Sequence, residues 1–266
     1  MYRVIETLRA IPPEVYVVEK GFEKFVAKSF SSNEGEALKI LNHPGIVRFV
    51  DKSKITKNEF MGFDDFMIME NLKGGALDEL DFPLPLKEAI EYGRNIAEIM
   101  SYIDKNKMVH GDIKPEHYVL HEKSGKLVDF EFSGRVNERG YADCLGYTLE
   151  YVAPEVVFLK RVYPKSEVYS LGLTVFEMLH PQGQERYVVK REILNDIFND
   201  PEEYTEEEFR IARGYTGFVT SDDVKRIDNC ELLGCPKLVS LIECMVEIDM
   251  GKRPTIQEVV ERLKEL

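Results

Sequence analysis

The pattern of apolar residues changes after Leu72 in this chain of 266 residues. Before that point, short runs of β-branched and aromatic residues alternate with turn signals, which indicates strands. After the "KGG" that follows, apolar residues recur at helical spacing over long stretches. A chain that is β-rich first and helix-rich afterwards is typical of the α+β class. We expect a small lobe with a five-stranded antiparallel sheet and one helix in residues 1–72, and a larger helical lobe in residues 73–266, together forming one domain.

Several individual elements can be placed within these two segments. A turn around Gly21 joins two strands of residues 14–30 into a hairpin. The helix that follows has Ser32 or Asn33 as its expected N-cap. Two more strands are expected in residues 45–55 and 65–72. The expected helices span residues 31–43, 86–106, 168–179 and 255–266.

The charge balance excludes some classes of partner. The chain has 35 Lys and Arg against 48 Asp and Glu, a net charge of -13, so its overall field does not attract nucleic acid or an anionic membrane. The first residues lack the apolar core of a signal peptide, and no apolar run reaches the roughly 18 residues of a membrane helix, so we expect a cytoplasmic protein. Residues 195–209 contain seven acidic residues and no basic one. This segment is either a solvated helix face or a docking patch for a basic partner.

A few polar residues have the chemistry that phosphoryl transfer needs, which is a cation for the phosphates, a carboxylate for a metal ion and a base near the attacking hydroxyl. Lys28 ends the apolar run "FVAK", and the next helix carries Glu34, which could pair with it. Asp112 and Lys114 stand two residues apart in "HGDIKPEH", and Asp129 follows the apolar strand "KLV". Taken singly, each has a plainer interpretation, since a strand lysine is usually a surface residue and an aspartate often belongs to a turn.

The order of these segments resembles that of eukaryotic-type protein kinases along nearly the whole chain. "VAK" resembles the strand motif that carries the catalytic lysine, "HGDIKPEH" resembles the HRDLKPEN loop, and "DFE" resembles the DFG motif. "YTLEYVAPE", "SEVYSLG" and "KRPT" resemble GTxxYxAPE, SDVWSLG and the closing arginine motif of the family. The resemblance implies a two-lobed kinase fold, ATP with Mg²⁺ or Mn²⁺ as cofactors, and transfer of the γ-phosphate to Ser or Thr hydroxyls of a protein substrate.

Position within the family pattern implies the role of each catalytic residue. Asp112 should accept or orient the proton of the substrate hydroxyl, while Lys114 should stabilise the γ-phosphate beside Thr148. Lys28 should hold the α- and β-phosphates and be oriented by Glu34, with Glu36 as the alternative partner. The implied metal ligand is Asp129, and the implied structural ion pair of the helical lobe is Glu155 with Arg253.

The resemblance also implies an adenine site between the lobes. The residues expected to sandwich the ring are Val15, Ala27 and Val119. Met69 falls at the gatekeeper position, and the backbones of Glu70 and Leu72 fall where the hinge pairs with adenine.

The glycine-rich loop of the family is absent. Aligned back from Val15, its three glycine positions fall on Leu8, Ala10 and Pro13. Glycines there let backbone N–H groups approach the phosphates, whereas Pro12 and Pro13 have no N–H. We therefore expect a weakened phosphate cradle.

The metal site departs from the family pattern at two residues. His117 stands where the family has an asparagine, and imidazole suits transition metals better than Mg²⁺. Glu131 replaces the DFG glycine. Either the second metal position has decayed, or Glu131 supplies the oxygen that His117 lacks. Both interpretations remain open from the sequence.

Two further substitutions concern the catalytic loop. Gly111 replaces the arginine that receives a phosphorylated activation loop in the family, so no such switch is expected. Glu167 replaces an aspartate and keeps its charge.

Three functions are therefore compatible with the sequence. The first is an ATP-dependent serine/threonine protein kinase, which the five retained polar residues favour. The second is a pseudokinase acting as a binding or scaffold module, which the lost glycines, His117 and Glu131 favour. The third is a small-molecule phosphotransferase, which "HGD" suggests but "APE" opposes.

Overall fold

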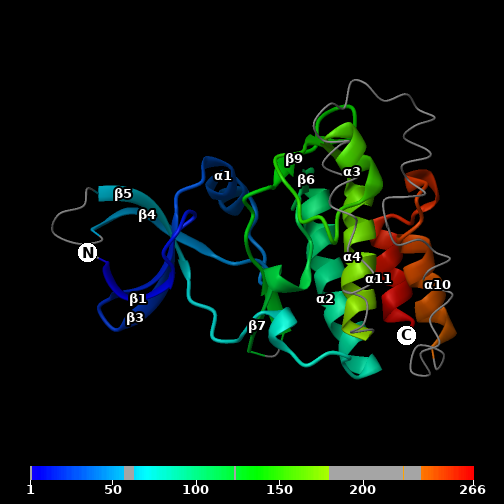
Figure 1. Ribbon diagram of the computed structural model, residues 1–266, viewed down its shortest axis with the longest axis horizontal. Coiled ribbons are helices and arrows are strands. Elements are labelled where there is room, and N and C mark those ends of the chain that lie inside the picture. The colour runs from blue at the N-terminus through cyan, green and yellow to red at the C-terminus, as the bar shows by residue number, and fades with distance from the viewer. Residues whose placement is uncertain (1, 57–62, 123, 180–223, 225–234) are drawn as a thin grey trace.

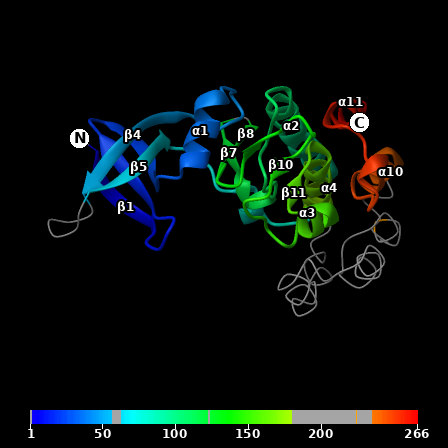
Figure 2. The ribbon, with the colours of Figure 1, turned by 90° about the horizontal axis from the view of Figure 1, so that it is seen from above.

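The computed structural model describes residues 2–56, 63–122, 124–179, 224 and 235–266, and it has the expected α+β architecture. A β-sheet lobe lies at one end of the long axis and a helical lobe at the other (Figure 1). Figure 2, a view from above, shows the same separation. Among the described residues, no helix is both long enough and apolar enough to span a bilayer. The acidic segment at 195–209 falls outside the described residues.

The small lobe is a five-stranded sheet with the order β1-β2-β3-β5-β4. Its strands are β1 (Arg3–Arg9), β2 (Val15–Lys20), β3 (Glu23–Ser29), β4 (Phe49–Thr56) and β5 (Phe63–Glu70). All its neighbouring strands are antiparallel, as expected. The β2–β3 hairpin is confirmed, and Gly21 in its turn has φ 68°, a left-handed conformation that glycine adopts without strain.

Helix α1 (Ser32–Ile40) packs beside this sheet, and its N-cap differs from the prediction. The cap is Ser31, whose hydroxyl accepts from the backbone N–H of Glu34. The expected caps were Ser32 and Asn33, but Ser32 already belongs to the helix. The side chain of Asn33 is engaged elsewhere, because it donates to the backbone oxygens of Glu131 and Ser133.

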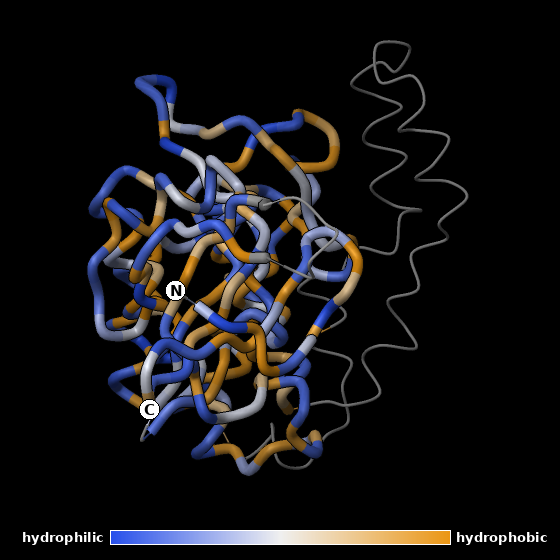
Figure 3. Tube along the Cα trace, turned by 90° about the vertical axis from the view of Figure 1, so that its left-hand side faces the viewer, coloured by the Kyte–Doolittle hydropathy of each residue, from blue (hydrophilic) through white to orange (hydrophobic). Residues whose placement is uncertain are grey.

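The helical lobe is built around α2 and α4. Its helices are α2 (Leu86–Lys105), α3 (Pro154–Leu159), α4 (Pro164–Leu179), α10 (Pro236–Met245) and α11 (Ile256–Lys264). The apolar helix predicted at 168–179 lies in α4, and every residue from Leu171 to Leu179 is buried. Hydrophobic and hydrophilic stretches alternate along the trace (Figure 3), as expected when each element buries one face.

One large hydrophobic core crosses the junction between the lobes. It joins Leu38 and Leu41, from α1 and the residue after it, and Met69 of β5 to the apolar faces of α2 and α4. The ion pair predicted for the helical lobe is present and buried, with Arg253 Nη1 2.7 Å from Glu155 Oε1 and Nη2 2.9 Å from Oε2. This contact fixes the segment before α11 against α3.

Short elements connect the longer helices of the helical lobe. They are the 3₁₀ helices η1 (Leu77–Glu79), η2 (Pro115–His117) and η4 (Met250–Lys252), and the strands β6 (Met108–Val109), β7 (Tyr118–His121), β8 (Ser124–Leu127), β9 (Gly134–Arg135), β10 (Ala142–Asp143) and β11 (Arg161–Val162). β7 pairs with β8 and β6 pairs with β9, both in antiparallel fashion, and Leu127 of β8 forms an isolated bridge with Ile46 of the sheet lobe.

Candidate active site

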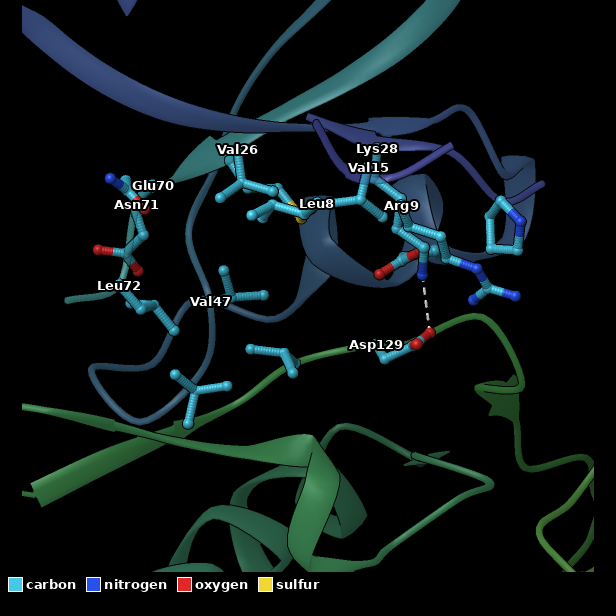
Figure 4. Close-up of a pocket in the computed structure, with 15 residues that line it drawn as sticks. Leu8, Arg9, Val15, Val26, Lys28, Val47, Glu70, Asn71, Leu72 and Asp129 are labelled. Carbon is cyan, nitrogen blue, oxygen red and sulfur yellow. Dashed lines mark hydrogen bonds and ion pairs between the residues drawn. The ribbon is translucent and has the colours of Figure 1, made fainter. Parts of the chain in front are cut away.

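A cavity of about 290 Å³ opens between the sheet and the helical lobe (Figure 4). Eight of the residues expected around ATP line it: Val15, Lys28, Glu34, Met69, Glu70, Leu72, Val119 and Asp129. The hinge residues and the charged residues lie at opposite ends of the cavity in Figure 4. The cavity therefore has a largely apolar end and a charged end.

Ala27 is a correction to the expected lining. It is fully buried in a small cluster within the sheet lobe, beside Tyr16 and Phe66, and does not line the cavity. Successive side chains of a strand point to opposite faces, so the residue that shares the face of Lys28 is Val26. Val26 lines the cavity in its place.

The charged end is organised around Lys28. Its Nζ lies 2.7 Å from Glu34 Oε2 and 2.8 Å from Asp129 Oδ1. Strand β3 brings the lysine to the cavity, the first turn of α1 brings Glu34, and the segment after β8 brings Asp129. Glu36, the alternative partner, is exposed.

Burial and pairing act in opposite directions on these three groups. Burial disfavours the charged form of Lys28, but the two carboxylates outweigh it and hold its pKa above the usual range. Burial raises the pKa of Glu34, and Lys28 offsets only part of that rise. Burial also acts to raise the pKa of Asp129, but Lys28 and His117 together bring it below its ordinary value. Asp129 is therefore held ionised at neutral pH.

A second polar group forms on the catalytic-loop side. The carboxylate of Asp112 accepts from the backbone N–H of Thr148 at 2.8 Å and from its hydroxyl at 2.9 Å. Lys114 Nζ lies 3.1 Å from Asp112 Oδ2 and donates to the Thr148 hydroxyl at 2.7 Å. The structure thus brings together the three residues that the sequence placed at the phosphate-accepting end.

Glu167 of α4 anchors the backbone of this loop. Its Oε1 accepts from the N–H groups of His110 at 2.7 Å and Gly111 at 2.8 Å. Burial raises the pKa of Glu167 to about 7, although the two N–H groups favour its ionised form. Gly111 has φ 89°, and a Cβ there would lie 2.2 Å from the backbone oxygen of Phe132. Only glycine fits this position without movement of the chain.

The imidazole of His117 lies between the two aspartates. Its Nδ1 is 2.9 Å from the backbone oxygen of Asp112, which can only accept, so Nδ1 carries the proton in the neutral ring. Nε2 then presents a lone pair toward Asp129 Oδ2, 3.6 Å away. Burial lowers the pKa of His117, although Asp129 opposes this. Two electron-pair donors that face each other in this way fit a divalent cation, with the ring nitrogen favouring a transition metal.

Glu131 does not join this pair. Its Oε2 lies 3.9 Å from Lys28 Nζ, and its side chain is 39% exposed. In the described part of the chain, no three His, Cys, Asp or Glu side chains are arranged to hold a metal ion. The two interpretations of Glu131, compensation for His117 and decay of the second metal position, therefore both stay predictions.

Several residues of the site were not singled out from the sequence. Val47 and Val128 complete the apolar walls, and Arg9 lines the charged end. Asn33 links α1 to the segment after Asp129 through its bond of 2.8 Å to Glu131 O. The two valines could have been predicted from the alternation of buried and exposed positions along the chain. No such signal exists for Arg9, or for the bond that Asn33 makes to the segment after Asp129.

The arrangement supplies the parts of a phosphoryl-transfer site. One end offers an apolar slot for a flat ring, the centre offers a lysine held between two carboxylates, and the far end offers a carboxylate with a second lysine beside it. The carboxylate and the lysine of the far end come from one loop, which Glu167 holds from below.

Comparison with known proteins agrees with this geometry. The family model for the protein kinase domain matches residues 14–263. The match begins after the segment in which the glycine-rich loop was expected. Among curated proteins, the chain is 32% identical to smooth muscle myosin light chain kinase of Gallus gallus over 163 residues. It is 28% identical over 233 residues to the putative serine/threonine-protein kinase R436 of Acanthamoeba polyphaga mimivirus. It is 31% identical over 179 residues to the serine/threonine-protein kinase STE20 of Saccharomyces cerevisiae.

These matches cover very different shares of the relatives. The aligned regions take in 56% of this chain and 8% of the muscle kinase, and 65% of this chain and 18% of the yeast kinase. The viral match takes in 84% of this chain and 75% of that protein.

Proposed function

The chain belongs to the protein kinase family, and on that premise we propose that it transfers the γ-phosphate of ATP to serine or threonine hydroxyls of a protein substrate. The observation that carries this proposal is that two polar groups are both assembled. Lys28 is paired with Glu34 and Asp129, and Asp112 is bonded to Thr148 and Lys114.

We propose that the adenine ring enters the apolar end of the cavity. Val15, Val26 and Val119 would sandwich it beneath the gatekeeper Met69. The backbones of Glu70 and Leu72 would pair with its edge. The side chain of Glu70 is already engaged, since it bonds Lys126 Nζ at 2.6 Å and the Arg48 N–H at 2.7 Å, and this support favours a fixed hinge. In this proposal residues 1–72 form the small lobe and residues 73–266 the large lobe of one kinase domain.

The proposed catalytic roles follow from which side chains can accept a proton and which carry a positive charge. Asp112 is an acceptor that faces the shelf at Thr148, so it would orient the substrate hydroxyl and receive its proton. Lys114 would neutralise charge on the γ-phosphate, and Lys28 would hold the α- and β-phosphates. A divalent cation, Mg²⁺ or Mn²⁺, would neutralise the phosphates when bound, and Asp129 with Nε2 of His117 would hold it.

A second candidate is a pseudokinase that acts as a binding or scaffold module, with weak or no phosphotransfer. Two observations favour it, namely the imidazole at the metal position and the absence of glycines above the phosphates. The basic partner suggested for residues 195–209 and the cytoplasmic location remain expectations from the sequence.

One experiment distinguishes the two candidates. We expect the purified chain to bind ATP with Mg²⁺ or Mn²⁺, seen as a rise in melting temperature, and to label itself or a generic Ser/Thr protein with γ-phosphate. Asp112→Asn should abolish the labelling and keep the melting shift, because Asp112 acts on the acceptor hydroxyl and not on ATP. Binding without labelling in the wild type would favour the second candidate, and no shift with either metal would refute the proposed transfer from ATP.

A further inference from the structure

The sheet lobe contributes one arginine to the lining of the charged end. This residue is Arg9, at the last position of β1. It lines the cavity together with its neighbours Leu8 and Pro13. Figure 4 places it at the same end as Lys28 and Asp129, opposite the hinge residues. Its side chain is therefore above the region where the proposed function places the phosphates.

An irregularity in the sheet explains why Arg9 faces the cavity. In the β1–β2 register Thr7 pairs with Tyr16 and Arg9 pairs with Val15, so two steps on β1 match one step on β2. Such a bulge changes the alternation of side chains and redirects them locally. Arg9 is consequently opposite Val15, and directly opposed residues of an antiparallel pair share a face. Val15 also lines the cavity.

Arg9 brings to the cavity a positive charge that is open to a phosphate. Arg9 and Lys28 are the two cationic residues among those that line the cavity. Lys28 is already bonded to Glu34 and Asp129. Within the described residues, Arg9 forms no ion pair, and its guanidinium makes one long bond of 3.4 Å to the backbone oxygen of Pro12.

We propose that Arg9 is a phosphate-binding residue, whose guanidinium takes the place of the backbone N–H groups that a glycine-rich loop would offer. Pro12 and Pro13 contribute no N–H to the loop that follows, which leaves fewer backbone donors than a glycine-rich loop would offer, and a side chain can supply the missing ones. The guanidinium offers five N–H donors in a planar fork that suits two phosphate oxygens at once. This inference rests on the proposed function, because it assumes a nucleoside triphosphate in the cavity.

Calorimetric titration of the full chain with MgATP and with adenosine tests the inference. Arg9→Ala should weaken MgATP binding about tenfold, the size of one lost bond to a charged group, and leave adenosine affinity unchanged. The affinity of Arg9→Lys for MgATP should lie between those of the wild type and Arg9→Ala, since lysine keeps the charge but not the planar fork of N–H donors. Arg3→Ala is the matched control, because Arg3 lies on the same strand, is exposed, and pairs with Glu19 away from the cavity.

The outcomes separate this inference from the function on which it rests. Equal MgATP affinity in wild type and Arg9→Ala would refute the role of Arg9 and leave the proposed function intact. Equal losses for MgATP and adenosine would also refute it, since Arg9 would then shape the cavity and not bind phosphate. A wild type that binds neither ligand would refute both proposals.

Discussion

Glu167 offers a direct test of the electrostatics beneath the catalytic loop, through the substitution Glu167→Gln. The carboxylate is 6% exposed and is held by two backbone N–H groups, yet burial raises its pKa to about 7 from an ordinary value of 4.5. The folded chain therefore binds a proton more tightly at this site than the unfolded chain does. Between pH 4.5 and 7 the folded state keeps that proton while the unfolded state has lost it, so stability falls as the pH rises. The pKa difference corresponds to a loss of ~3 kcal/mol across this window.

Urea unfolding at pH 5, 6, 7 and 8 measures this effect. Glu167→Gln removes the titration but retains an oxygen that can accept from His110 and Gly111. The free energy of unfolding of the variant minus that of the wild type should therefore increase with pH, by up to ~3 kcal/mol from pH 5 to pH 8. Glu261→Gln is a suitable control, because the side chain of Glu261 is 72% exposed and its substitution should give a difference that is nearly constant with pH.

Taking the difference cancels the contribution of the other titratable groups, which the two proteins share. A variant-minus-wild-type difference that stays flat from pH 5 to pH 8 would refute the reasoning. It would mean that the two N–H bonds hold the carboxylate ionised despite its burial.

Four further perturbations test other parts of the site. His117→Asn should shift the preference for metal–ATP from Mn²⁺ toward Mg²⁺ in calorimetric titrations, and equal preference in both proteins would exclude imidazole ligation. Glu131→Gly should strengthen metal–ATP binding severalfold, since its carboxylate lies 3.9 Å from Lys28 and adds negative charge near the phosphates; a weaker complex would show that Glu131 helps to hold the metal. Phosphatase treatment, verified by mass spectrometry, should leave activity unchanged because Gly111 offers no charge to a phosphate, whereas loss of most activity would contradict this. Asn33→Ala should lower stability by about 1–2 kcal/mol and speed amide exchange at residues 131–133, and exchange identical to that of the exposed control Asn42→Ala would count against its linking role.

The sequence predicted the architecture well because the relevant signals were local. The hairpin at Gly21 and the helices at 86–106 and 255–266 depend on turn chemistry and on periodicity, both of which short windows contain. The N-cap of α1 was misplaced because three candidate caps stand in a row. The choice among them depends on Asn33, which bonds to Glu131 and Ser133 far along the chain.

The site residues could be predicted where they belong to contiguous sequence motifs, but not where their orientation depends on an irregularity in a strand. Lys28 and Asp129 were found from their motifs, and the structure brings them within 2.8 Å. The place of Ala27 in "VAK" predicted that it would line the adenine site. Alternation of side chains along a strand instead favours Val26, which is two residues before Lys28. Arg9 could not have been found, because its orientation depends on a bulge that leaves no mark in composition or spacing.

The geometry at Gly111 also bears on what a protein engineer could do with this chain. Restoring the arginine of other family members would place a Cβ 2.2 Å from the Phe132 carbonyl oxygen, on a backbone with φ 89°. That oxygen belongs to the main chain, so no side-chain rotation relieves the clash, and the segment after Asp129 would have to move. A single substitution therefore cannot install control by phosphorylation here. The change would need at least one companion mutation in the neighbouring segment.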